Sequence, residues 1–369
     1  MRIARFTALA VAGAILAGGV AGASASSAGT PRPTDMSGPA DSLPFDGDVG
    51  LFGTQDPTYD GVFRQSYALM GLVAAGANIP RPAVAWLLDQ QCADGSFVAY
   101  RTDTSEPCPP SDPTTYSGPD TNSTALALSA LTAVGESRAA GDAADWLLAQ
   151  QTRGGGFPYY AGGSPDTNST GLAMAALTLV DGTSKQRRNA ANYERRMAYG
   201  CNSDPDLVGS MPYMAGMLPE SMSTTQSLLG LSRAFLVRER SQQRANPSVT
   251  CDGNGRVENV KGATARWIAR ALRANDGRLP DAFNPQVTDW NSTAVAIIGL
   301  VAARTSGIAT DIAITALANN IDDYVEDGEG GRAGALGTAI LAAVATGSDP
   351  RDFGGRDLVA DLQSTRQTS

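Results

Sequence analysis

The chain has 369 residues, 42% of them hydrophobic, and 28 Lys and Arg residues against 37 Asp and Glu residues give a formal net charge of −9. A chain this acidic offers no basic surface for phosphates, so no nucleic-acid partner is expected. It contains no histidine. This excludes His-ligated zinc and the Ser-His-Asp and Cys-His catalytic groups, and we expect neither a metal nor a cofactor.

The N-terminus has the order of a secretory signal peptide. Arg2 and Arg5 precede an apolar run over 6–20, and small residues follow at 23–25. We therefore predict a signal peptide over 1–25 and a secreted protein without stable membrane insertion. An uncleaved anchor is the alternative, although the run is shorter than the ~20 residues that span a bilayer. Residues 26–58, rich in Ser, Gly and Pro, are expected to form a flexible leader; a short structured piece around Leu51 and Phe52 stays open.

From residue 59 onward the chain repeats a helix made of small residues. Three segments share an Asp-x-Asn-Ser-Thr start, and three weaker copies follow the same frame. The strong copies are 120–135, 166–180 and 289–300, and the weak ones are 61–76, 220–231 and 334–347. Because they are apolar nearly all round, each is expected to form a helix that is buried on most sides. Asn-Ser-Thr is expected to cap the helix, with the preceding acid favouring its positive end.

A second helix type lies between these copies, with Trp and Leu on one face and charge on the other. The two strongest examples end in Gln-x-x-x-Gly-x-Phe, from Gln91 to Phe97 and from Gln151 to Phe157. The second helices are expected at 82–91, 143–151, 185–198, 266–272, 311–325 and 355–363. Six buried helices alternating with six half-exposed helices predict an all-α (α/α)6 toroid over 59–369, an inner ring inside an outer ring. An open helical solenoid is the alternative.

The Gln-x-x-x-Gly-x-Phe ends resemble the prenyltransferase and squalene-oxidase repeat, which builds the α/α toroid of terpenoid cyclases. The resemblance covers roughly 59–369 and implies the same closed fold. Class II terpene cyclases carry Asp-x-Asp-Asp-Thr-Ala where this chain has Asp120-Thr-Asn-Ser-Thr-Ala, so Asn122 stands in place of the proton-donating acid. Protein prenyltransferases also need a histidine for their zinc. The resemblance therefore implies a secreted, divergent member that lacks the known catalytic motifs.

If the inner helices all run in one direction, their N-termini meet at one mouth of the toroid. The candidate ligand-binding residues there are Asp120, Asn122, Asp166, Asn168, Glu220, Asp289, Asn291, Trp290, Tyr159 and Tyr160. Such a mouth is suited to an unknown small molecule, a glycan or a peptide. Alternatively, these residues only cap helices.

No residue is assigned a catalytic role, and the sequence favours a non-enzyme. Two competing functions stay open. One is an enzyme, either terpene-cyclase-like or carbohydrate-active, that uses the mouth carboxylates. The other is a structural protein of the cell envelope, with envelope proteins as its partners.

Four cysteines follow the predicted signal peptide: Cys92, Cys108, Cys201 and Cys251. An even count in an exported chain predicts disulfides, with three possible pairings. The pairs closest in sequence are Cys92–Cys108 and Cys201–Cys251. Free thiols or a metal site are the alternative, but the Cys-x-x-Cys spacing of zinc sites is absent. The segment 252–258 is similar to the middle of an EF-hand loop but lacks its terminal Glu, so an ordinary turn is expected there.

Overall fold

The computed structural model describes residues 49–234, 248–282, 284–326 and 332–368. The predicted signal peptide and positions 26–48 of the expected leader lie outside these ranges. Within them the regular secondary structure is nearly all helical, with one small two-stranded sheet. None of the helices described is both long and apolar enough to cross a membrane.

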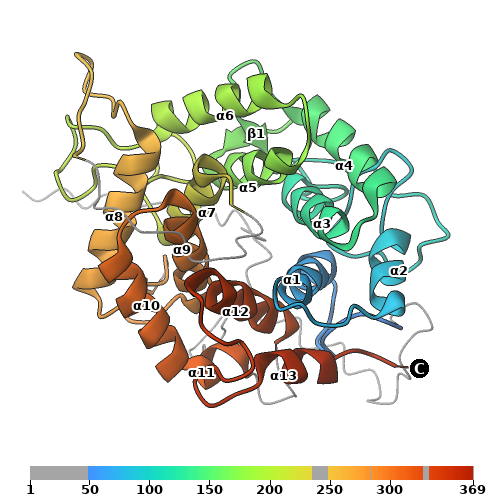
Figure 1. The fold of residues 1–369 in the computed structure, drawn as a ribbon. Coiled ribbons are helices and arrows are strands. Elements are labelled where there is room, and N and C mark those ends of the chain that lie inside the picture. The colour runs from blue at the N-terminus through green and yellow to red at the C-terminus, as the bar shows by residue number, and fades with distance from the viewer. Residues whose placement is uncertain (1–48, 235–247, 283, 327–331, 369) are drawn as a thin grey trace, which may run out of the picture.

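Six helices form an inner ring around the centre of the molecule (Figure 1). They are α1 (Gly61–Ala74), α3 (Thr121–Val134), α5 (Thr167–Ala176), α7 (Ser221–Ser232), α9 (Trp290–Ala303) and α12 (Ala333–Thr346). A 3-10 turn, η2 (Leu177–Leu179), extends α5. Each inner helix contacts the next one along the chain, and α12 contacts α1. The ring is therefore closed, which confirms the predicted toroid and excludes the open solenoid.

The outer helices flank the inner ring and bury one face each. They are α2 (Arg81–Asp89), α4 (Ser137–Gln150), α6 (Ser184–Met197), α8 (Val260–Ala274), α10 (Gly307–Asn319) and α13 (Leu358–Ser364), with a short α11 (Ile321–Val325) after α10. In α2 and α4 the buried face carries Trp86 and Leu147, as the amphipathic pattern predicts. The inner helices are buried nearly all round instead. All twelve predicted helices are present, and they alternate as expected.

Small residues allow neighbouring inner helices to approach closely. A Cβ added at Gly171 of α5 would lie 2.4 Å from the carbonyl oxygen of Gln226 on α7, and one added at Gly230 of α7 would lie 2.4 Å from the carbonyl oxygen of Gly171. The same holds between α12 and α1, where a Cβ at Gly337 would lie 2.4 Å from the carbonyl oxygen of Tyr67. Backbone-to-backbone contact of this kind requires glycine and fixes the spacing of the ring.

The two ends of the described chain meet and complete the toroid. Leu51 and Phe52 are fully buried, so the structured piece left open by the sequence is present. The backbone N–H of Gln367 donates to the carbonyl of Leu51 at 2.8 Å, and the N–H of Gly53 donates to the carbonyl of Thr365 at 3.0 Å. The N-terminal segment is therefore held by the C-terminal one, as closure requires.

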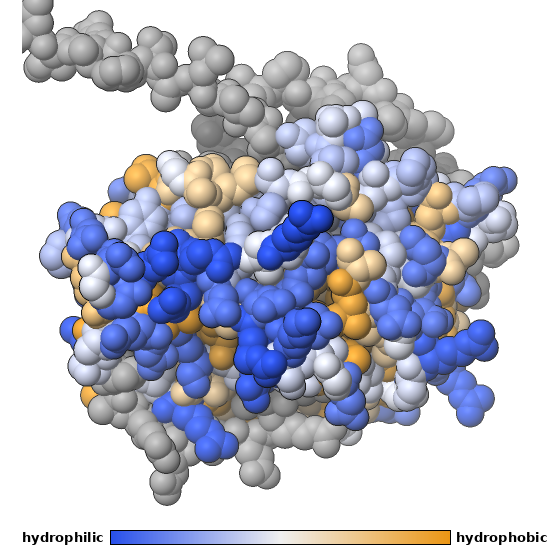
Figure 2. All heavy atoms as spheres, turned by 90° about the horizontal axis from the view of Figure 1, so that it is seen from above, coloured by the Kyte–Doolittle hydropathy of each residue, from blue (hydrophilic) through white to orange (hydrophobic). Residues whose placement is uncertain are grey.

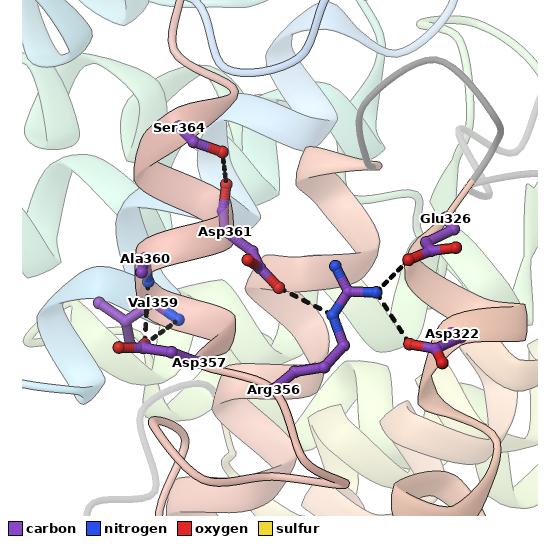
Figure 3. A network of polar contacts seen from close by, with 8 residues as sticks. All are labelled: Asp322, Glu326, Arg356, Asp357, Val359, Ala360, Asp361 and Ser364. Atoms are coloured by element: carbon purple, nitrogen blue, oxygen red, sulfur yellow. Dashed lines mark hydrogen bonds and ion pairs between the residues drawn. The ribbon is translucent and has the colours of Figure 1, made fainter.

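An ion-pair network joins α13 to α11 beside this closure (Figure 3). The guanidinium of Arg356 lies 2.8 Å from a carboxylate oxygen of Asp322 and 2.8 Å from one of Asp361, and it also contacts Glu326. Hydrogen bonds to these three acids raise the pKa of Arg356, the bond to Asp322 first among them. One arginine thus holds together acids from two helices of the last repeat.

Two disulfides staple the irregular segments between helices. Cys92 pairs with Cys108, and Cys201 pairs with Cys251, which confirms the sequence-local pairing. The first lies before α3. The second joins the segment after α6 to the segment before α8, where residues 252–258 form a turn closed by hydrogen bonds from the N–H groups of Asn254 and Arg256 to Asp252.

Candidate functional site

The acid that precedes each Asn-Ser-Thr is the helix cap. The Oδ1 atom of Asp120 accepts the backbone N–H of Ser123 at 2.8 Å, and its Oδ2 atom accepts the Ser123 hydroxyl at 2.6 Å. Asp166 binds Ser169 in the same way, at 2.6 and 2.9 Å. Glu220 and Asp289 accept the N–H groups of Ser223 and Ser292 at 2.9 and 2.8 Å. The expectation that Asn-Ser-Thr itself caps was wrong, because the cap lies two residues before the asparagine, at Asp120 and Asp166.

The threonine of the motif joins each inner helix to the loop before it. The Oγ1 atom of Thr124 accepts the N–H of Phe97 at 3.0 Å, and that of Thr170 accepts the N–H of Phe157 at 2.9 Å. Gln91 lies at the other end of this loop. Its side-chain amide donates to the carbonyl of Gly95 at 3.0 Å and to the carbonyl of Ala139, in the outer helix α4, at 2.9 Å. Gln-x-x-x-Gly-x-Phe and Asp-x-Asn-Ser-Thr are therefore two halves of one connection between rings.

The asparagines of the motif form a buried chain of amides across three helices. The Nδ2 group of Asn122 donates to Oδ1 of Asn168 at 2.8 Å, and Nδ2 of Asn168 donates to Oε1 of Gln226 at 2.6 Å. The sequence did not reveal Gln226, because α7 carries Met222 in the asparagine position and the amide comes one turn later. Its only signal is a glutamine within an otherwise small and apolar helix body. Further round the ring, Asn291 accepts the hydroxyl of Tyr324 at 3.2 Å.

Burial changes the acidity of the capping carboxyls. It raises the pKa of Asp120 to about 6 and that of Asp166 to about 7, and it raises those of Glu220 and Asp289 as well. The neighbouring charge of Glu220 adds to the shift of Asp166. Asp120 and Asp166 each use both oxygens on a serine of their own helix. The carboxyls are thus built as caps, and Asp120 alone of the four lines the cavity described next.

A cavity of about 470 Å³ opens beside Asp120, and we call it the tyrosine pocket. Its aromatic lining consists of Tyr59, Tyr100, Tyr116, Tyr159 and Tyr160. The chain contains ten tyrosines, so half of them meet here. Neither Phe nor Trp lines this cavity, so its aromatic surface combines apolar rings with polar hydroxyl tips.

The sequence candidates are divided between this pocket and the protein interior. Asp120, Tyr159 and Tyr160 line the pocket. Asn122, Asp166 and Asn168 are at most 2% exposed. Glu220, Asp289, Trp290 and Asn291 lie at other helix starts and do not line it.

Tyr59, Tyr100 and Tyr116 were missed by the sequence analysis. Each belongs to a loop outside the repeated helices. Each of these tyrosines lies within a few residues of an inner-helix start or of a Gly-x-Phe end. This position could have identified them, because the fold brings those segments to the same side of the toroid.

The tyrosines of the pocket hold one another in place. The rings of Tyr159 and Tyr160 lie 4.6 Å apart in an edge-to-face arrangement, and the hydroxyl of Tyr160 donates to the carbonyl of Tyr116 at 2.8 Å. Burial, followed by the Asp120 charge, raises the pKa of Tyr160 to about 12. At the rim, Tyr59 and Tyr116 remain 60% and 50% exposed. Tyr116 also has a φ of 55°, a strained conformation for a bulky residue.

One wall of the tyrosine pocket is the loop over 101–109, anchored by Arg101 and by the Cys92–Cys108 disulfide. The Arg101 guanidinium donates to four backbone carbonyls, on both sides of the loop, so its charge is used within the protein. The acids of this wall are the exposed Asp103, which accepts the N–H and the hydroxyl of Ser105, and the exposed Glu106. A second cavity of about 770 Å³ lies on the other side of the same loop and includes Trp146 in its lining.

Comparison with known proteins supports the fold. No protein-family model and no curated protein matches the chain. A protein from Actinoplanes has 16% sequence identity and a TM-score of 0.51, covering 81% of this chain and 94% of its own. The type II terpene cyclase MstE from Scytonema, without ligand, has 13% identity and a TM-score of 0.50, covering 80% and 91%. At this identity the likeness shows the terpene-cyclase-like helical toroid and nothing about activity.

Proposed function

We propose that this protein is a secreted, non-catalytic binder that takes an uncharged glycan in the tyrosine pocket. The observation that carries the proposal is the gathering of five of the ten tyrosines around one cavity of about 470 Å³. A tyrosine ring offers a flat apolar face to the C–H groups of a sugar ring, while its hydroxyl bonds the sugar hydroxyls. Aromatic side chains also lose little conformational entropy on binding.

Charge narrows the class of ligand. The exposed carboxylates of the lining are those of Asp103 and Glu106, while the single arginine of the lining is bound to backbone carbonyls. An anionic ligand would therefore meet repulsion without a free cation to offset it. Carboxylates are good acceptors for sugar hydroxyls, so a neutral polyhydroxylated ligand suits the lining.

Three further features support the remaining parts of the proposal. The capping carboxyls are held by serines, which argues against their use as an acid–base pair. The cavity of about 770 Å³ behind the 101–109 loop continues the hollowed surface and favours a chain of several sugars. The two disulfides suit an oxidising compartment, in agreement with the signal-peptide pattern of residues 1–25, and a glycan of the cell envelope would be available there.

The proposal is tested by titrating the protein with neutral oligosaccharides and polysaccharides in calorimetry. Replacing the two exposed rim tyrosines, Tyr59→Ala with Tyr116→Ala, should weaken binding at least tenfold, about 1.4 kcal/mol, without lowering the melting temperature. The matched Phe variants keep the rings and should retain most of the affinity. Ile308→Ala, at a still more exposed apolar residue outside the pocket lining, is the control.

Two outcomes would refute the proposal. One is equal glycan affinity in the wild type and the double Ala variant. The other is no glycan binding together with turnover of an isoprenoid substrate, which would instead establish a cyclase.

The disulfides provide a second test with an internal control. Cys92→Ser with Cys108→Ser frees the wall of the pocket and should reduce glycan affinity, whereas Cys201→Ser with Cys251→Ser lies outside the lining and should not. Loss of the Cys92–Cys108 disulfide should lower the free energy of unfolding by about 3 kcal/mol, and loss of the Cys201–Cys251 disulfide by about 4 kcal/mol. Both variants are therefore compared below their melting temperatures. Equal affinity losses in the two variants would contradict the role assigned to the loop.

A further inference from the structure

A second, chemically different pocket lies at the C-terminal end of α7, away from the tyrosine pocket. It has a volume of about 220 Å³ and is lined by Arg187 and Arg188 of α6 and by Arg233, the residue that ends α7. We call these three residues the arginine pocket. The floor is apolar or small, with Met174, Gly230 and Leu231 among the lining residues. Three arginines thus border one hollow in a chain whose net charge is −9.

The charges of the arginine pocket are not neutralised within the described ranges. None of the three arginines forms an ion pair with a carboxylate there, in contrast to Arg356, which contacts three acids. The Nε group of Arg187 instead donates to the Thr183 hydroxyl at 3.1 Å, and its Nη2 group donates to the Ser184 hydroxyl at 3.3 Å. Burial and then the charges of Arg233 and Arg188 lower the pKa of Arg187. Mutual repulsion of this kind is relieved by binding an anion.

The helix that supplies two of the arginines adds to the positive potential. Arg187 lies in the first turn of α6, whose N-terminus has no side-chain cap because the Thr183 hydroxyl is directed at the carbonyls of Leu177 and Val180. Uncapped N–H groups and the positive end of the helix dipole both favour a bound anion. The outer side of the molecule that carries α6 is strongly hydrophilic and accessible (Figure 2).

We propose that the arginine pocket binds a tetrahedral oxyanion, the phosphate or sulfate group of a larger molecule. Guanidinium groups present forked N–H donors that match two oxygens of such a group at once, and three of them converge here. The Ser184 hydroxyl supplies a further donor. This site is independent of the tyrosine pocket, whose free charges are negative, so the two take ligands of opposite electrostatic character.

The test is calorimetric titration of the full mature protein with inorganic phosphate, sulfate and pyrophosphate in a buffer without other oxyanions, against sodium chloride of matched ionic strength. Binding is expected to rise with the charge of the anion. Arg187→Gln with Arg233→Gln should weaken it at least tenfold. Arg188→Gln, at an exposed position, should weaken it without disturbing the fold. Arg304→Gln is the control, since Arg304 ends α9 as Arg233 ends α7, with nearly the same φ, but does not line the pocket.

Vesicles of phosphatidylglycerol, compared with phosphatidylcholine vesicles, distinguish the two sources of the phosphate group. Binding to the anionic vesicles that is lost in Arg188→Gln would assign the site to a lipid headgroup, and binding to soluble pyrophosphate alone would assign it to a soluble phosphate ester. Either result supports the proposal. Anion and vesicle binding that is absent in the wild type, or equal in the wild type and both pocket variants, would overturn it.

Discussion

Asp166→Asn is expected to change how stability depends on pH. Asp166 is 1% exposed, and burial raises its pKa from 3.8 to about 7. A carboxyl with a raised pKa in the folded state favours folding fully below pH 3.8, and this contribution is lost as the pH rises through about 7. Asn caps a helix as well as Asp does and does not titrate. The variant should therefore keep the cap and lose the pH dependence of this group.

The size of the effect follows from the two pKa values. At 1.36 kcal/mol for each pKa unit, a shift from 3.8 to about 7 corresponds to about 4 kcal/mol over the full titration. Of this, roughly 2–3 kcal/mol falls between pH 5 and pH 8. Asp120, with a pKa of about 6, should add about 1 kcal/mol in the same window and with the same sign. The wild type should thus be more stable at pH 5 than at pH 8.

Urea denaturation followed by circular dichroism at the two pH values measures this difference. Asp166→Asn should lose roughly 2–3 kcal/mol less than the wild type on going from pH 5 to pH 8. Asp112→Asn is the matched control: hydrogen bonds from Thr114 lower the pKa of Asp112 to about 2, so it is ionised throughout this window. Identical pH dependence in the wild type and Asp166→Asn would refute the raised pKa of this buried cap.

The remaining predictions concern the inner ring and are measured as free energies of unfolding in urea. Asn168→Ala leaves the amides of Asn122 and Gln226 unpaired and should cost about 2–5 kcal/mol; a loss of only about 1 kcal/mol would indicate a simple capping role. Gly171→Ala would push α5 away from α7 and should lower the free energy of unfolding by at least about 1–3 kcal/mol. Gly141→Ala, on α4 with open space around it, should raise that free energy by up to about 1 kcal/mol. Equal effects of the two variants would contradict the close packing of α5 on α7.

The sequence by itself determined the repeat, the alternation of two helix types and the local disulfides. These properties depend on residues that are close in the chain. The period of apolar and small residues defines which helix is buried all round, and Cys92 and Cys108 are separated by only 16 positions. The absence of histidine and the place of Asn122 in the motif were equally visible without coordinates.

The tertiary structure decided what the motif residues do and where an open site lies. The cap of α3 is Asp120 and not the Asn-Ser-Thr that begins two residues later, because the helix already begins at Thr121. Gln226 joins the amide chain because α5 and α7 lie side by side, although Asn168 and Gln226 are 58 residues apart in the sequence. Tyr100 and Tyr160 each follow a Gly-x-Phe end by three residues, but Tyr59 and Tyr116 come from loops outside that repeat. Their meeting depends on how the ring closes, and closure is a property of contacts between residues distant in the sequence.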